Sequence, residues 1–183
     1  RHISKVFKAG NQYVLVGESA TLAKSDDGKT WTRLESPYKG PWFGGLATKG
    51  GAWLIYGMRG NVFRSEDGGA NWERRNRLAN AAACEGHDHP AAPRDGETGH
   101  CVHNMVRAAG TADVLYQQNH HGVWRSPDGG RSWEDITKGL PSTFGFPVGA
   151  HPRDAGTVWV FPLNGDSLGR WPVGNRAAVW KSE

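Results

Sequence analysis

The stretch Ser65-Glu66-Asp67-Gly68-Gly69-Ala70-Asn71-Trp72 decides the fold of this chain, because it recurs. A second copy at residues 126–133 reads Ser-Pro-Asp-Gly-Gly-Arg-Ser-Trp. A third copy at residues 25–31 is one residue shorter and reads Ser-Asp-Asp-Gly-Lys-Thr-Trp. A fourth copy would begin at Ser182. Self-similarity of this kind indicates a protein built from repeated structural units.

The sequence upstream of each serine repeats as well. A short strand-like run that ends in a basic residue precedes every copy. Another apolar run lies upstream of each of these strand-like runs. Val14, Leu54 and Leu115 each lie 11 residues before their serine, which predicts strands in a common register. Each unit is therefore expected to be a four-stranded antiparallel sheet, with its fourth strand starting at Trp31, Trp72 or Trp133.

These units predict an all-β fold: a β-propeller or partial propeller of about four four-stranded blades. The blades are expected at about residues 1–36, 40–76, 100–137 and 144–183 of a single domain, with a long loop at 77–99. The fourth unit lacks its outer strand, as in a fragment or a chimera of two propeller types. Because an exposed sheet edge is normally covered, we expect a second copy, or a strand borrowed from residues 1–7, to cover it.

The repeated motif has the chemistry of a self-tied turn. Serine and aspartate side chains accept hydrogen bonds from nearby backbone amides, and glycine adopts a positive φ without strain. The closing tryptophan can bury its ring between sheets. We assign a structural role to the repeated positions Ser25, Asp27, Gly28, Trp31, Ser65, Asp67, Gly69, Trp72, Ser126, Asp128, Gly130 and Trp133.

Composition agrees with short strands and tight turns and excludes several functions. The 183 residues include 26 Gly and 9 Trp, and no apolar stretch has the length of a membrane-spanning helix. The net charge is +4 and no Lys/Arg run exceeds two residues, so nucleic-acid binding is not expected. No signal segment is recognisable, and the compartment stays open, with a periplasmic or secreted location favoured.

The motifs resemble known families. The turns look like the Asp-box (BNR) repeats of sialidases, sortilin-type propellers and related proteins. The N-terminal part resembles bacterial proteins related to the photosystem II assembly and stability factor, at residues 36–40 (SPYKG), 43–46 (FGGL) and 56–65 (YGMRGNVFRS). The C-terminal part resembles bacterial sialidase-like or glycosyl-hydrolase-like propellers, at residues 99–103 (GHCVH), 115–120 (LYQQNH), 145–147 (GFP) and 151–154 (HPRD). The Asp boxes are specific for fold and weak for function.

A sialidase resemblance implies an arginine triad, a tyrosine nucleophile activated by a glutamate, and an acid aspartate. Tyr13, Tyr56 and Tyr116 fall in predicted inner strands and are expected to be core residues. Other glycosidases use two carboxylates at a set separation. Candidate carboxylates outside the boxes are Glu18, Glu97, Asp113 and Asp166, for which surface solvation is the preferred explanation. No catalytic residue and no cofactor are therefore assigned.

Histidines and cysteines crowd into one part of the chain. His87, His89, His100 and His103 are weak candidates for a metal site, because imidazole and thiolate suit zinc or copper. Their spacing matches no standard zinc module, so no metal is expected and a polar loop is the preferred interpretation. Cys84 and Cys101 are either a disulfide pair or both free.

Four residues make up the candidate binding set: Arg59, Arg170, His120 and His121. Arg59 follows a predicted strand in a Gly-Met-Arg-Gly turn, where loops reach a propeller face and a partner can approach closely. Two functions remain open. The first is a non-catalytic scaffold that binds a protein or supports assembly of a complex. The second is a carbohydrate-active or sugar-binding propeller.

Overall fold

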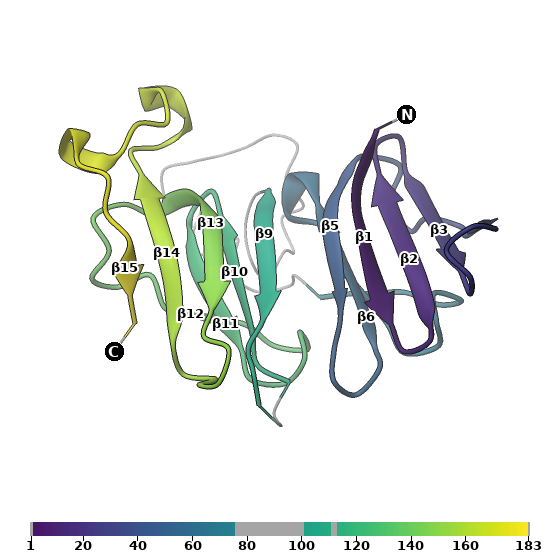
Figure 1. Ribbon diagram of the computed structural model, residues 1–183. Coiled ribbons are helices and arrows are strands. Elements are labelled where there is room, and N and C mark those ends of the chain that lie inside the picture. Colours follow the sequence, from purple (N-terminus) through teal and green to yellow (C-terminus); the bar gives the residue numbers. More distant parts are fainter. Residues whose placement is uncertain (1, 76–100, 111–112, 183) are drawn as a thin grey trace.

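The computed structural model describes residues 2–75, 101–110 and 113–182 of the chain (Figure 1). The described residues form four antiparallel sheets with strands in sequence order, so the fold is all-β as predicted. The first sheet holds β1 (Ile3–Ala9), β2 (Gln12–Gly17), β3 (Thr21–Ser25) and β4 (Thr32–Arg33). The second holds β5 (Trp42–Ala47), β6 (Trp53–Gly57), β7 (Val62–Ser65) and β8 (Glu73–Arg74).

The third sheet holds β9 (Val102–Arg107), β10 (Leu115–Asn119), β11 (Gly122–Ser126) and β12 (Glu134–Asp135). The fourth has three strands among the described residues: β13 (Phe144–Ala150), β14 (Val158–Leu163) and β15 (Trp180–Lys181). Short 3-10 turns are η1 (Met58–Gly60), η2 (Asp166–Leu168) and η3 (Val173–Asn175). The expected loop at 77–99 lies outside the described residues.

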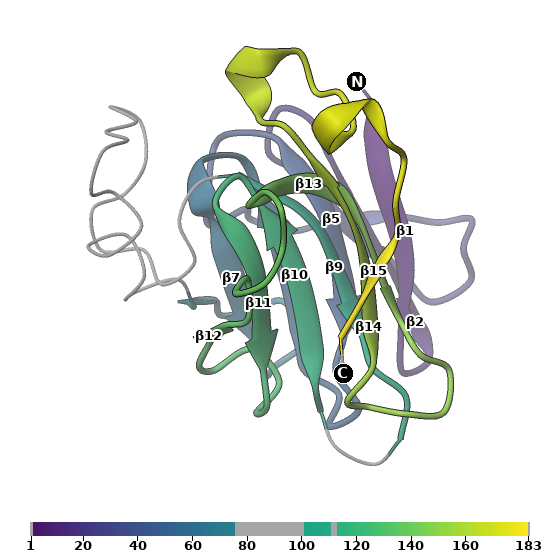
Figure 2. The ribbon, with the colours of Figure 1, turned by 90° about the vertical axis from the view of Figure 1, so that its left-hand side faces the viewer.

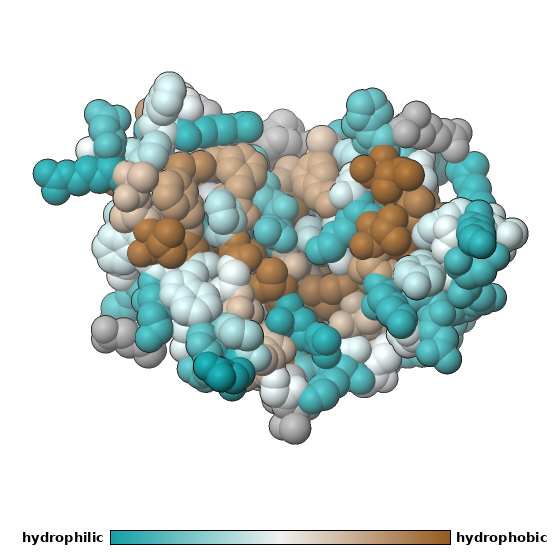
Figure 3. Space-filling view, viewed as in Figure 1, coloured by the Kyte–Doolittle hydropathy of each residue, from teal (hydrophilic) through white to brown (hydrophobic). Residues whose placement is uncertain are grey.

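The sheets stand side by side like the blades of an incomplete propeller. The first strand of each sheet contacts that of the next, β1 against β5, β5 against β9, and β9 against β13 (Figure 1). The open side of this arc is partly apolar. Figure 3 shows apolar side chains gathered on this face. Two apolar residues of β1, Ile3 and Val6, are 59% and 48% exposed.

The hydrophobic core lies between neighbouring sheets rather than inside one layer. Because side chains alternate along a strand, β6 buries both of its faces. Trp53 and Ile55 pack toward the first sheet, whereas Leu54 and Tyr56 pack toward the third. A third cluster between the third and fourth sheets contains Ala108, Val114, Tyr116, Val123, Val148, Val158 and Val160. Each sheet is therefore held by its neighbours.

The Asp-box loops are tied by hydrogen bonds within each loop. Ser65 Oγ accepts from the Gly69 amide at 2.8 Å, and Asp67 Oδ1 accepts from the Asn71 amide at 2.8 Å. In the third sheet Ser126 Oγ binds the Gly130 amide in the same way, at 2.8 Å. The shorter first loop shifts this bond by one residue, so that Ser25 Oγ accepts from Gly28 at 2.9 Å.

Backbone amides that point at these carboxylates also favour their ionised forms. The Thr30 and Lys29 amides lower the pKa of Asp27 to about 2, and the Asn71 amide and side chain lower the pKa of Asp67 to about 2.

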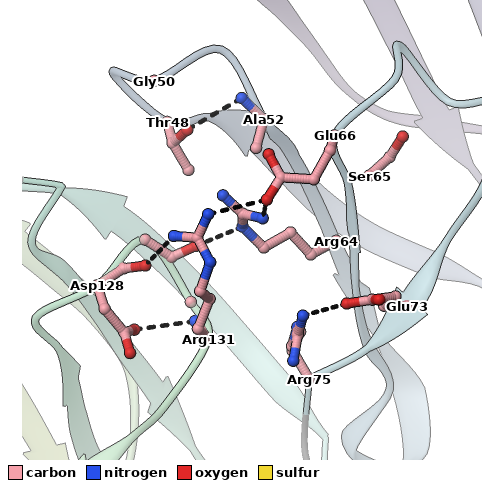
Figure 4. Close-up of polar contacts among 12 residues, drawn as sticks. Thr48, Gly50, Ala52, Arg64, Ser65, Glu66, Glu73, Arg75, Asp128 and Arg131 are labelled. Carbon is pink, nitrogen blue, oxygen red and sulfur yellow. Dashed lines mark hydrogen bonds and ion pairs between the residues drawn. The ribbon is translucent and has the colours of Figure 1, made fainter.

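The loops also join one sheet to the next. Arg64 Nε donates to the carbonyl oxygen of Gly129, in the following Asp box, at 2.9 Å. Figure 4 shows Arg64 and Arg131 meeting at the carboxylate of Glu66, with Arg131 at 2.9 Å. Lys24, which holds the repeat position of Arg64, lies 3.5 Å from the carbonyl oxygen of Gly68 in the second box. A basic side chain therefore links each of these sheets to the next loop.

The closing tryptophans pack between sheets. Trp72 packs against the core of the first and second sheets, and its indole donates to the Gly69 carbonyl at 3.1 Å. Trp133 packs against the core of the second and third sheets and donates to the Arg75 carbonyl at 3.2 Å. Trp31 is half-buried.

The structure corrects the predicted strand details. The outer strands start one residue later than predicted, at Thr32, Glu73 and Glu134, because the tryptophans belong to the turns. The shared register also fails in the third sheet. Val14 pairs with Lys24 and Leu54 with Arg64, but Leu115 pairs with the box serine itself, Ser126. The cause is a shorter β10–β11 turn, in which His120 and His121 alone separate the paired ends.

Two further expectations about the first sheet are wrong. Tyr13 is 36% exposed rather than buried, because it lies near the start of β2 on the face opposite Val14, which no other sheet covers among the described residues. Residues 1–7 are also not free to cover the edge of the fourth sheet. From Ile3 onward they form β1, which pairs with β2 inside the first sheet.

Candidate functional site

The candidate binding residues lie at the end of the strands opposite the Asp boxes. Because β2, β6, β10 and β14 run antiparallel to the strands before the boxes, the turns that follow them lie at the other end. These turns carry Arg59 in η1, His120 and His121 between β10 and β11, and Arg170 after β14. Figures 1 and 2 agree that the segment after β14 rises from this end.

Four rings form the centre of the site, which we call the His–Phe cluster: His103, His120, Phe144 and Phe146. His103 stacks on Phe146 with ring centroids 4.3 Å apart and planes at 22°. The His120 ring lies 4.6 Å from His103. Phe144 meets both histidines edge-on, at 5.2 and 5.3 Å. Such geometry combines aromatic contact with imidazole hydrogen-bonding capacity.

Strand alternation places these rings together. Val102 is buried in the core between the second and third sheets, so the next residue, His103, faces away from it. Phe144 and Phe146 are two apart in β13 and lie close enough for an edge-on contact at 5.3 Å. His103 Nδ1 lies 2.5 Å from the Gly145 carbonyl oxygen, which ties β9 to β13. The cluster therefore spans two neighbouring blades.

Arg170 adds positive charge to the cluster. Its guanidinium carbon lies 5.4 Å from the centroid of Phe146, a cation–π distance. Arg170 has a φ of 59°. Asn164 holds this turn, because its side chain donates to the Leu168 carbonyl and accepts from the Trp171 amide. The same turn presents two apolar side chains to solvent, Leu168 at 66% and Trp171 at 64% exposure.

Arg59 lies at the same end, beside the start of β9. It is exposed, has a φ of 62°, and its amide donates to Cys101 Sγ at 3.3 Å. The side chain of Asn61 donates to the Met58 carbonyl at 2.8 Å and braces the turn. His121 is placed by its amide, which donates to Asn119 Oδ1 at 2.8 Å. The structure therefore brings His120 and Arg170 into one cluster, with Arg59 and His121 on adjoining turns.

Sequence reasoning missed Phe144 and Phe146. Both lie in β13 (Phe144–Ala150), inside the fourth predicted unit, and neither is assigned a binding role from the sequence. Period-2 spacing of two phenylalanines beside a glycine was the available signal. His103 was treated only as a weak metal candidate or core residue, whereas it is a half-buried member of the ring cluster.

Most of the residues that were weighed as metal ligands lie outside the described residues. His87, His89, His100 and Cys84 fall there, so pairing of Cys84 with Cys101 is not tested. Within residues 2–75, 101–110 and 113–182, no three His, Cys, Asp or Glu side chains gather as metal ligands would.

Tyr56, Tyr116 and Asp113, which were weighed for catalysis, are buried or hydrogen-bonded within the fold. Tyr56 is 2% exposed, and burial raises its pKa to about 12. Tyr116 is buried and donates to the Ala155 carbonyl at 2.7 Å. Asp113 accepts from the amides of Lys49 and Gly50, which links the third sheet to the β5–β6 turn. Glu18 lies in the β2–β3 turn and Asp166 in η2, whereas Glu97 lies outside the described residues.

Comparisons with known proteins show the fold. No protein-family model and no curated protein sequence matches the chain. Among solved structures, YCF48 bound to a D1 peptide matches with a TM-score of 0.59 and 16% identity, over 86% of this chain and 47% of that one. YCF48 from Cyanidioschyzon merolae matches with a TM-score of 0.62 and 17% identity, over 98% of this chain and 58% of that one.

An enzyme has a similar fold. The GH74 xyloglucanase from Xanthomonas campestris matches with a TM-score of 0.64 and 19% identity, over 98% of this chain and 29% of that one. The chain thus spans less than two thirds of each of these proteins, and it shares their propeller architecture. No helix among the described residues is long and apolar enough to cross a membrane.

Proposed function

We propose that this chain is a non-catalytic propeller scaffold that binds an anionic segment of a partner protein at the end carrying the His–Phe cluster. The observation that supports this most is the stacking of Arg170 over Phe146 beside His103 and His120. An arginine guanidinium has the planar fork of N–H donors that recognises a carboxylate, and its contact with the Phe146 ring orients it at this end of the sheets.

Three features of the surroundings support a protein ligand. Arg59 adds a second exposed cation at the same end. Leu168 and Trp171 add exposed apolar area of the kind that anchors protein interfaces. Turns that project from a rigid sheet scaffold are suited to recognition. In addition, a protein of the same fold, YCF48, has been solved with a D1 peptide bound.

Sugar binding is the second candidate, and it rests on the exposed Trp171 and on the fold shared with GH74 enzymes. An exposed indole can stack on a sugar ring. Glycoside hydrolysis additionally requires two opposed carboxylates. The residues described in the His–Phe cluster contribute rings and a cation instead, so a sugar would be bound without being cleaved.

A peptide-display selection on the purified chain tests the proposal. We expect the selected peptides to be enriched in Asp and Glu, and their affinity to fall about tenfold or more in Arg170→Ala. Arg153→Ala is the matched control, because Arg153 is an exposed arginine in the β13–β14 turn at the opposite end. Peptides that bind Arg170→Ala as tightly as the unmodified chain would refute the proposed site. Xyloglucan oligosaccharides, tested in parallel, measure the second candidate.

A further inference from the structure

Gln118 is a buried polar residue beside the turn that carries His120. It is 1% exposed and lies in β10, where its side chain reaches toward the fourth sheet. Strand alternation explains this direction, because Tyr116, two residues earlier, packs between the third and fourth sheets. Burial takes an amide away from water, so the hydrogen bonds of Gln118 have to come from the protein.

The amide nitrogen of Gln118 lies at the meeting point of three backbone carbonyl groups. It donates to the carbonyl oxygens of Asn119 at 2.9 Å, Gly122 at 3.0 Å and Thr143 at 2.9 Å. An amide nitrogen carries two hydrogens, so the three acceptors share them. Asn119 and Gly122 pair at the two ends of the β10–β11 turn, whereas Thr143 directly precedes β13. One nitrogen therefore ties both ends of this turn to the start of the fourth sheet.

These bonds fix the backbone on both sides of a ring contact in the His–Phe cluster. His120 lies within the tied turn, and Phe144 directly follows Thr143. The two rings meet with centroids 5.3 Å apart, across the boundary between the third and fourth sheets. The Thr143 hydroxyl also lies 3.5 Å from the His120 carbonyl oxygen. The distance between the rings therefore depends on the backbone groups that Gln118 holds.

The oxygen of the same amide packs against Gly145, whose carbonyl group contacts another ring of the cluster. A Cβ at position 145 would lie 3.1 Å from Gln118 Oε1 and 2.9 Å from the Phe161 carbonyl oxygen. Glycine therefore leaves the space in which the amide fits. The Gly145 carbonyl oxygen lies 2.5 Å from His103 Nδ1. The segment that packs on Gln118 is thus also the segment that holds His103.

The neighbouring residue Gln117 shows that these bonds do not simply follow from burying a glutamine in β10. Gln117 is 0% exposed, and it faces away from the fourth sheet because side chains alternate along a strand. Neither its amide oxygen nor its amide nitrogen has a hydrogen-bond partner within the part of the chain that the structure describes. The two glutamines therefore form a matched pair, with similar burial in one strand but opposite hydrogen bonding.

We infer that Gln118 is the positioning residue of the His–Phe cluster, which holds His120 against Phe144 in the arrangement that binds an anionic segment. Its burial keeps it from touching the bound segment, so it acts through the rings. This inference rests on the proposed function, because it names the residue that pre-organises that site. A site whose rings are already in place binds with a smaller loss of entropy, which raises the affinity.

Gln118→Met and Gln117→Met, compared by NMR, test the inference without any ligand. Methionine is close to glutamine in size and has no N–H donor. We expect the nuclear Overhauser effects between the His120 and Phe144 rings to be lost in Gln118→Met and retained in Gln117→Met. A residue that only stabilised the fold would lower the Tm and leave these ring contacts unchanged in the folded molecules, and that result would overturn the inference.

Binding measures the consequence for the site. A labelled oligoglutamate peptide should bind Gln118→Met about tenfold more weakly than the unmodified chain, whereas Gln117→Met should keep the full affinity. Equal affinities of the two variants would overturn the inference. Failure of the proposed function gives a different result: the peptide would bind the unmodified chain no better than Arg170→Ala, while the ring contacts would still decide the role of Gln118.

A measurement on the unmodified chain does not depend on either variant folding. Because they are buried and hydrogen-bonded, the side-chain amide protons of Gln118 should exchange with D2O more slowly than those of Gln12. Gln12 is the control, since its amide hydrogen bond to Asp26 lies at the exposed surface. Exchange of the Gln118 protons as fast as that of the Gln12 protons would contradict the inference.

Discussion

Replacing Arg64 by methionine removes the best-defined link between two neighbouring sheets. The Arg64 side chain is 3% exposed and its Nε binds the Gly129 carbonyl at 2.9 Å. Its terminal nitrogen also pairs with Glu66, a carboxylate that is 59% exposed (Figure 4). Methionine keeps most of the aliphatic volume, so that the loss reports on the polar contacts.

The expected loss of stability follows from these contacts. A hydrogen bond from a charged donor contributes about 1.5–3 kcal/mol. The pair with a half-exposed carboxylate adds about 0.2–1 kcal/mol after solvent screening. The free energy of unfolding should therefore fall by about 2–4 kcal/mol, which for a chain of this size corresponds to a Tm lower by roughly 4–16 °C.

Urea unfolding of Arg64→Met beside Arg125→Met measures the effect. Arg125 holds the same repeat position, but its side chain is 35% exposed and its ion pair is with Glu134 of its own sheet. Arg125→Met should cost only about 0.5–1 kcal/mol. If the two variants lose equal stability, the link to the Gly129 carbonyl contributes nothing measurable and the reasoning is refuted.

Three other predictions concern the turns and the chemistry. Gly130→Ala should lose about 2–4 kcal/mol, because its φ is 84° and an added Cβ would lie 2.4 Å from Leu54. Gly139→Ala is the control, with a φ of 94° and no atom within 4 Å, and equal Tm losses would contradict the packing argument. The pKa values of Asp27 and Asp67 are lowered from 3.8 to about 2, so their stabilisation is complete above pH 3.8 and is lost as the pH falls toward 2. Asp67→Asn should flatten the Tm–pH curve between pH 3.8 and about 2 relative to Asp26→Asn. Identical curves for the two variants would contradict this role of Asp67. A fluorogenic sialoside should show no turnover at any acidic pH; turnover abolished by a point variant at the His–Phe cluster would overturn the non-catalytic assignment.

Much of the fold was readable from the sequence because the Asp-box motif carries its own geometry. Serine, aspartate and glycine at these spacings tie a turn by local hydrogen bonds, which need no knowledge of distant residues. Two eight-residue copies of the motif and a shorter third copy therefore predicted the positions of three hairpin turns. The short strand-like run predicted before each box serine corresponds to β3, β7 and β11, each of which ends at that serine.

Register and exposure depended on the whole structure. An equal spacing of apolar residues predicted one register for three sheets, but turn length sets hairpin pairing. The His120-His121 turn therefore shifts Leu115 opposite Ser126. Tyr13 was read as core from its strand position, yet it has no preceding sheet to cover it among the described residues.

The sequence by itself determined the repeated unit, because every bond within an Asp-box turn joins residues close together in the chain. Only the tertiary structure decided which side chains meet between units. His103 and Phe146 lie in different sheets, and Phe146 meets Arg170 only where the segment after β14 folds back over β13. Contacts of this kind depend on how the sheets pack, and no local pattern encodes them.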